Sequence, residues 1–174
     1  MDLPIAAGTY GIDTAHSQLG FGITHLGISI VRGTFDSFTG SLTVGEHLGD
    51  TAVEVDADMS SVNSGNAGRD EHLCGELFFD VANHPMMAFR STGISGHGSD
   101  YELNGDLMIR AITQPITLAV TFNGEAVFPM DGSTHFGFSA RGRISRSAFG
   151  IDYGVPMAGD DVDLHLEAQF VQPA

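Results

Sequence analysis

Residues 162–170 read Val-Asp-Leu-His-Leu-Glu-Ala-Gln-Phe, and their apolar and polar side chains alternate without a break. The polar positions are Asp163, His165, Glu167 and Gln169. Successive side chains of a β-strand point to opposite faces of the sheet, so this pattern predicts a strand with one buried and one solvated face. Strands of this kind are typical of antiparallel sheets.

The same alternation recurs along most of the chain. Within residues 115–122, Val120 shares one face with Ile116, Leu118 and Phe122, and we expect this face to be the inner one. Further strands are predicted at residues 18–25, 34–44, 53–59, 86–94, 101–109 and 136–144. Turn-forming stretches separate them at residues 45–50, 96–100, 123–124, 131–132 and 157–160. The chain is therefore expected to form about eight antiparallel strands.

One segment departs from the strand pattern. Residues 68–78, Gly-Arg-Asp-Glu-His-Leu-Cys-Gly-Glu-Leu-Phe, predict a short helix, in which Asp70 and Glu71 suit the positive end of the helix dipole. Residues 26–31 could add a further turn of helix. We find no internal repeat or linker, so residues 1–174 are expected to form a single domain.

The expected fold class is all-β, an eight-stranded antiparallel barrel with a short helical segment near residues 68–78. Strands of about 8–10 residues joined by hairpins favour a meander barrel, because closure leaves no exposed sheet edge. A barrel of eight strands is filled by its own side chains or holds one small ligand. The alternation by itself leaves both outcomes open.

The charge balance excludes several functions. The chain has 22 acidic residues, seven arginines and no lysine, for a net charge of −15. No Schiff-base lysine and no phosphate-loop lysine are therefore available. An acidic surface repels phosphate backbones, so nucleic acid is not expected as a partner. The single cysteine, Cys74, forms neither an internal disulfide nor a cysteine metal cluster.

Motifs for cofactor, metal or nucleophilic chemistry are not recognised. The stretch Gly20-Phe21-Gly22 lacks the third glycine of a dinucleotide fingerprint, and no cofactor is predicted. The eight histidines include no metalloprotease motif, and no metal site is predicted. An enzymatic alternative stays open, with His16, His25 or His72 as acid–base groups near neutral pH.

A secretory targeting signal would lie at the N-terminus. The first eight residues have no basic region and no apolar core of the kind a secretory leader contains. No apolar run approaches the roughly 18 residues of a membrane helix, so no integral membrane segment is expected. The sequence as given predicts a cytoplasmic protein, or a periplasmic or secreted one if a leader has been removed.

A series of ordered motifs gives a more specific indication. They include Gly33-x-Phe35-x-x-Phe38-x-Gly40, Arg69-Asp70-Glu71-His72-Leu73 and Gly105-Asp106-Leu107-Met108-Ile109-Arg110. A late motif, Arg146-Ser147-Ala148-Phe149-Gly150, completes the order. Together they resemble the YceI-like family over residues 10–170. The sequence departs from the family pattern where His84 precedes Pro85 and where Ala111, not glycine, follows Arg110.

The resemblance implies a lipocalin-like barrel with an elongated apolar cavity. It also implies a polyisoprenoid or other long-chain amphiphilic lipid as ligand, bound without chemistry, and it allows a homodimer. The residues expected to line the cavity are apolar and lie mostly on strands. They are Phe21, Ile23, Phe35, Phe38, Val55, Leu73, Phe78, Phe89, Leu107, Leu118, Val120, Phe136, Phe138, Leu164 and Leu166.

Three residues are candidates for contact with a lipid head group: Arg69, Arg146 and His25. Arginine suits this role because its planar fork of N–H groups binds phosphate with two parallel hydrogen bonds. For both arginines, a structural salt bridge with one of the acidic residues is the competing interpretation. Three functions are therefore compared: a lipid carrier, an enzyme acting on such a lipid, and a module whose barrel is filled by its own side chains.

Overall fold

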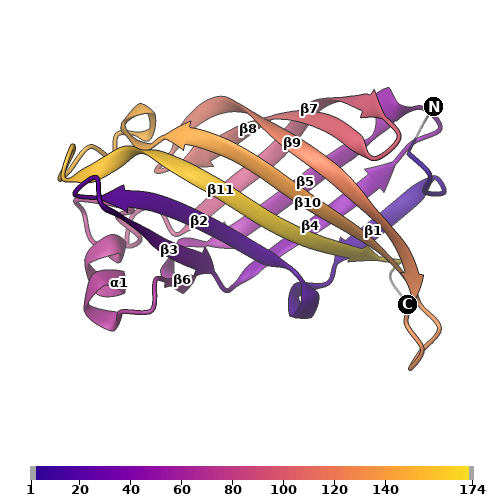
Figure 1. The fold of residues 1–174 in the computed structure, drawn as a ribbon, viewed down its shortest axis with the longest axis horizontal. Coiled ribbons are helices and arrows are strands. Elements are labelled where there is room, and N and C mark those ends of the chain that lie inside the picture. Colours follow the sequence, from indigo (N-terminus) through magenta and orange to yellow (C-terminus); the bar gives the residue numbers. More distant parts are fainter. Residues whose placement is uncertain (1–2, 173–174) are drawn as a thin grey trace.

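The computed structural model describes residues 3–172, and Figure 1 shows them as one long, twisted barrel with a short helix at one end. Eight strands close the barrel in the order β1–β4–β5–β7–β8–β9–β10–β11, and β11 pairs back onto β1. All the pairings between neighbouring strands are antiparallel. The expected eight-stranded antiparallel barrel is confirmed. Its strands are β1 (Gly8–Ile12), β4 (Phe38–Val44), β5 (Ala52–Asp58), β7 (Met86–His97), β8 (Asp100–Ile109), β9 (Ile112–Val127), β10 (Thr134–Ser145) and β11 (Ala158–Val171).

Three further strands extend the wall at the helical end. β2 (Gln18–His25) pairs with the first part of β11, β3 (Ser29–Phe35) pairs with β2, and β6 (Val62–Asn63) pairs with β3. β1 and β2 pair with the same edge of β11, one after the other. The 3-10 turn η1 (Thr14–His16) separates the two strands in the chain. Asp13 caps this turn by accepting a hydrogen bond from the backbone N–H of Ala15 at 3.0 Å.

The helix α1 (Ala67–Cys74) begins one residue earlier and ends four residues sooner than the sequence predicts. The Asn66 side chain caps its first turn by accepting from the N–H of Arg69 at 2.9 Å, and Gly75 ends it. Three 3-10 turns complete the elements: η2 (Leu48–Asp50), η3 (Met59–Ser61) and η4 (Arg146–Phe149). No α-helix among residues 3–172 is long and apolar enough to cross a membrane.

Four local predictions are wrong. The turn predicted at residues 157–160 ends earlier, because β11 already begins at Ala158. Residues 26–31 form no helical turn, because a tight turn at Leu26 and Gly27, both with positive φ, leads directly into β3. The strand predicted at residues 34–44 is divided between β3 and β4 at Asp36. The pair Asn123-Gly124 is not a hairpin turn but lies inside β9, at a shift in register against Gly137 and Phe138. The glycine there supplies a positive φ for a bulge instead of a turn.

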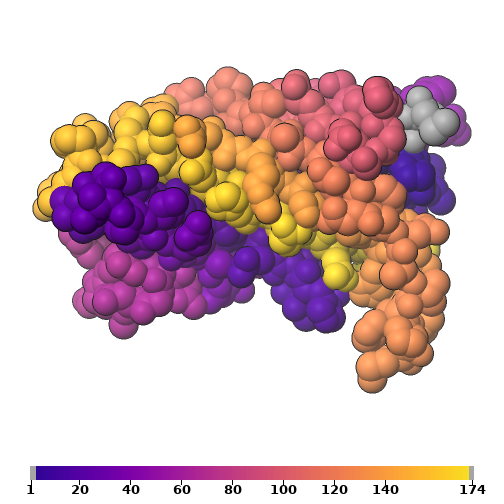
Figure 2. Space-filling view, viewed as in Figure 1, coloured from indigo at the N-terminus to yellow at the C-terminus, as the bar shows by residue number. Residues whose placement is uncertain are grey.

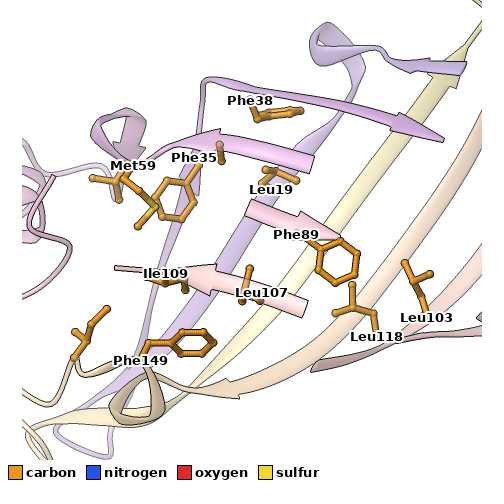
Figure 3. Packing of buried hydrophobic residues seen from close by; sticks show 13 residues of the cluster. Leu19, Phe35, Phe38, Met59, Phe89, Leu103, Leu107, Ile109, Leu118 and Phe149 are labelled. Atoms are coloured by element: carbon orange, nitrogen blue, oxygen red, sulfur yellow. The ribbon is translucent and has the colours of Figure 1, made fainter. Parts of the chain in front are cut away.

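Two hydrophobic clusters occupy the interior. The larger one contains Phe89, Leu103 and Leu118. These side chains come from the neighbouring strands β7, β8 and β9 and lie close together in Figure 3. The smaller one fills the barrel end away from α1 and contains Tyr10, whose ring meets Phe136 edge to face at 5.2 Å. The alternation in the sequence thus places one apolar face of every long strand inside the barrel.

Candidate functional site

The barrel encloses a cavity of about 550 Å³. This lies within the range of roughly 300–1,000 Å³ that is usual for small-molecule sites. The inner face of β11 shows how the sequence builds the lining, because every second residue from Val162 to Phe170 faces the cavity. Residues 116, 118 and 120 do the same on β9, while Phe122 does not. The larger cluster is therefore a lined cavity and not a solid core.

Aromatic rings form part of this lining. Phe21 lies 5.6 Å from Phe35, and Phe35 lies 5.8 Å from Phe79, measured between ring centroids. Phe21 pairs directly with Gly33 across β2 and β3, and a Cβ atom at Gly33 would sit only 2.5 Å from the Phe21 ring. The glycine of the Gly-x-Phe motif therefore lets this ring lie flat against the wall, which leaves the centre of the barrel open.

The polar lining residues gather at one end of the cavity, next to α1. They come from the end of β2, from the segment between β6 and α1, from α1 itself, from η4, and from the loop between η4 and β11. They are Thr24, His25, Ser64, Arg69, His72, Arg146 and Tyr153. We call this end the mouth. At the opposite end the lining consists of apolar residues such as Leu3, Ile12, Leu42 and Phe170. The cavity is therefore amphiphilic along its length.

Arg69 is an exposed residue at the mouth whose guanidinium is only partly used. Its Nε donates to the Ser64 hydroxyl and its Nη2 donates to the Ser64 carbonyl, both at 2.7 Å. Asp70 holds Ser64 in place by accepting from its N–H at 2.9 Å and from its hydroxyl. Three of the five guanidinium N–H groups are not used by these bonds, and no ion pair to Arg69 occurs within residues 3–172. The side chain is thus oriented and retains donors for an anionic group.

Arg146 differs sharply from Arg69, because it is buried, with 6% of its surface exposed. Four of its five N–H groups donate to backbone carbonyls at 2.8–3.1 Å, namely those of Ile151, Tyr153, Ala158 and Gly159. Burial lowers the pKa of this guanidinium, and the nearby carboxylates of Asp160 and Asp152 act in the opposite direction. The geometry makes Arg146 the organiser of the loop at residues 150–159. Most of its donors are therefore used inside the protein, and the competing interpretation as a salt bridge finds no ion pair to Arg146 within residues 3–172.

Asp160 reinforces the same loop from β11. Its carboxylate accepts from the hydroxyls of Ser145 and Ser147 and from the N–H of Ser147 at 2.9 Å. The hydrogen bond from the Ser145 hydroxyl holds the pKa of Asp160 below its usual value. Together with Arg146, these bonds define one side of the mouth.

An aromatic group closes another side of the mouth. His72 meets Phe78 and Tyr153 edge to face, at 5.1 Å and 5.8 Å between ring centroids, and Phe78 lies 5.6 Å from Tyr153. Arg110 positions this group by donating from Nη1 to the Phe78 carbonyl at 3.0 Å and to the Gly150 carbonyl at 3.2 Å. The motif ending in Ile-Arg marked Arg110 in the sequence, but the pattern did not indicate its role at the mouth.

Most of the residues expected to line the cavity lie along it, and two do not. Phe136 is buried against Tyr10 in the cluster that fills the far end. Phe38 begins β4, pairs with Ala57 and is 9% exposed within the larger cluster, outside the cavity lining. Both have the inward-facing position that alternation requires. Their rings lie at strand ends, where neighbouring side chains fill the barrel, so the correct face did not guarantee contact with the open space.

The three histidines considered for catalysis are not brought together. His25 and His72 lie at the mouth, whereas His16 lies in η1, outside the cavity lining. Its Nδ1 is 2.7 Å from the carboxylate of Asp13, which also lies 3.6 Å from Nδ1 of His135. Burial raises the pKa of Asp13, but the hydrogen bonds from His16 and from the Ala15 N–H, together with the charges of His16 and His135, outweigh it, so the pKa lies below its usual value. The His16–Asp13 pair stabilises the turn between β1 and β2.

Lining residues of two kinds are not among those predicted from the sequence. Met87 and Ile144 lie on strands, and a strict count of alternate positions would have found them. Phe79, Phe149 and Ile151 lie in turns and loops, where no periodic pattern shows which way a side chain points. Only the folded chain brings these loop residues to the mouth.

Comparisons with known proteins agree with this architecture. A family model described as the YceI-like domain matches residues 10–170. Protein YceI of Escherichia coli O17:K52:H18 is 34% identical over 169 residues, covering 95% of this chain and 88% of that protein. The crystal structure of BcnA from Burkholderia cenocepacia superposes with a TM-score of 0.81 at 20% identity, over 91% of this chain and 98% of the other. A structure described as a polyisoprenoid binding domain from Saccharophagus degradans has a TM-score of 0.69 at 16% identity, over 94% and 98%.

Proposed function

The chain belongs to the YceI-like family, and from this premise we propose that its barrel binds and carries a long-chain amphiphilic lipid, such as a polyisoprenoid, without chemically changing it. One observation carries the proposal: the cavity is apolar along its length and polar only at the mouth. An amphiphile fits this arrangement with its chain inside the barrel and its head group beside Arg69 and His25. Support also comes from the similar fold of the domain that is described as polyisoprenoid-binding.

Burial of the apolar chain supplies enough free energy for tight binding. A chain that loses on the order of 500 Å² of its own surface to the cavity gains roughly 12 kcal/mol. Association and ordering costs of several kcal/mol leave affinity in the micromolar range or better. No acid–base chemistry is needed for this step, and the separation of His16 from His25 and His72 favours a carrier over an enzyme.

The proposal is tested by native mass spectrometry of the full chain purified without denaturant. We expect a species heavier than the 18.4 kDa polypeptide, and organic extraction should release a long-chain molecule of the matching mass. Complete removal of this molecule should lower the melting temperature, because a ligand that binds only the folded state stabilises it by mass action. Readdition of a polyisoprenyl alcohol or phosphate should restore the temperature. Spectra that show only the bare polypeptide, together with no thermal shift on addition of either lipid, would contradict the proposal.

The head-group site is tested by Arg69→Ala. We expect the variant to bind a polyisoprenyl phosphate about tenfold more weakly or worse, since hydrogen bonds to a charged group contribute roughly 1.5–3 kcal/mol. Binding of the matching alcohol should change little, because it lacks the phosphate oxygens. Fluorescence titration with both ligands measures the difference. Arg90→Ala is the control. Arg90 forms an ion pair with Asp56 at 2.9 Å, and both side chains are exposed. Equal losses for the phosphate and the alcohol would show that Arg69 acts only through Ser64 and the local structure.

A further inference from the structure

Large apolar side chains are exposed around the mouth. Three belong to the turn after β2 and the start of β3, and three belong to the loop that precedes β11. They are Leu26, Ile28, Ile30, Tyr153, Val155 and Met157. We call this set the rim. Ile28 is 84% exposed and Met157 is 57% exposed, so these side chains are not part of the core. Exposed apolar residues that cluster in this way mark a surface that is covered by something else.

The two halves of the rim are joined to each other and to the cavity. The N–H of Leu26 donates to the Met157 carbonyl at 2.7 Å, and His25 pairs with Ala158 in the sheet. Figure 1 shows the β2–β3 hairpin and the loop before β11 at the same end of the barrel, and Figure 2 shows both segments on the surface there. Tyr153 and Met157 also line the cavity itself. The apolar surface is therefore continuous from the inside of the barrel to the outside of the mouth.

The charges around the rim favour a bilayer as the covering surface. The chain has 22 acidic residues, yet none lies between residues 14 and 35, where Arg32 is the single formally charged side chain. Residues 153–159 have no charged side chain. Arg32 is exposed and has no ion pair within the part of the chain that the structure describes. An apolar tip with a nearby arginine matches the acyl layer and the phosphate layer of a membrane surface, and a tyrosine suits the boundary between them.

We propose that the rim inserts into the surface of a phospholipid bilayer, so that the ligand passes between bilayer and cavity through the mouth without crossing water. This inference rests on the proposed lipid-carrier function. A second copy of the chain on the same surface would cover the mouth and block the exchange, whereas a bilayer supplies or accepts the ligand there. The net charge of −15 opposes strongly anionic membranes, so the surface best suited to the rim is a zwitterionic one.

The test is flotation of the full chain with phosphatidylcholine vesicles. Ile28→Ser and Met157→Ser should each lower the vesicle-bound fraction. The double variant should lower the partition constant about tenfold or more. Met130→Ser is the matched control, because Met130 is also 84% exposed but lies in the hairpin between β9 and β10, at the other end of the barrel. This control should bind vesicles as the unaltered chain does.

Two further measurements separate this inference from the proposed function. Binding of a short-chain polyisoprenyl phosphate in aqueous buffer should be unchanged by Ile28→Ser, because Ile28 does not line the cavity. If the unaltered chain binds this ligand but does not float with vesicles, docking is wrong and the carrier function stands. If Ile28→Ser and Met130→Ser weaken vesicle binding equally, the rim is not the docking surface. A dimer in analytical ultracentrifugation that Ile28→Ser dissociates would assign the rim to a second copy instead.

Discussion

Arg146→Ala should lower the free energy of unfolding by about 3–5 kcal/mol, at the upper end for a single substitution, because a buried hydrogen-bond network loses its shared donor. The substitution leaves the carbonyls of Ile151, Tyr153, Ala158 and Gly159 without their donor. Each buried acceptor that loses its partner carries a desolvation penalty of about 1–3 kcal/mol. Water that enters the gap offsets part of this penalty. Urea unfolding followed by circular dichroism measures the change. Arg146→Lys should recover only a small part of the loss, since one ammonium group cannot reach four carbonyls.

Arg143→Ala is the control for this prediction. Arg143 lies three residues earlier in the chain, but its side chain is 63% exposed and its partner Asp163 lies at 2.7 Å on the barrel exterior. An exposed ion pair contributes little to stability, because water and salt screen it, so this variant should unfold nearly as the unaltered chain does. If Arg146→Ala were as stable as Arg143→Ala but bound a polyisoprenyl phosphate more weakly, Arg146 would be a head-group ligand and its structural role would be wrong.

Val120→Phe should lower lipid affinity about a hundredfold while the fold stays intact. Val120 lines the cavity and pairs across the sheet with Ala140, a small residue that also lines it. The added ring would occupy space for about three to four methylene groups of the ligand, each contributing about 0.8 kcal/mol when buried. Because the ring enters open space, the free energy of unfolding should change by less than about 1 kcal/mol. Lipid titration and urea unfolding of the same variant measure the two quantities.

Ala119→Phe adds the same ring one residue away, on the exposed outer face of β9. Its lipid affinity should match that of the unaltered chain. A filled barrel would give a different pattern for Val120→Phe, since overpacking costs about 1–3 kcal/mol of stability. A loss of stability in that range, with no lipid binding by the unaltered chain, would reject both the cavity and the carrier function.

The strands could be predicted from the sequence because their signal is local. Side chains two residues apart share a face, so residues 18–25 and 162–170 show their inner and outer faces without reference to any other part of the chain. The predictions at residues 26–31 and 123–124 failed where the backbone takes a positive φ. At Leu26 a residue other than glycine adopts that conformation, and at Gly124 a common turn signal serves a bulge. Neither outcome follows from residue type, since neighbouring strands impose it.

The candidate site divides in the same way. The apolar inner faces that line the cavity follow from alternation, and the sequence by itself determined them together with the barrel. The mouth depended on tertiary structure, because His25, Arg69, His72 and Tyr153 come from separate elements that meet only after the barrel closes. The different roles of Arg69 and Arg146 have the same origin. The two arginines lie in different motifs and were equal candidates in the sequence. What separates them is their surroundings, since backbone carbonyls surround Arg146 whereas Arg69 is exposed to solvent. Burial and hydrogen-bond partners are properties of the closed barrel, and no local pattern encodes them.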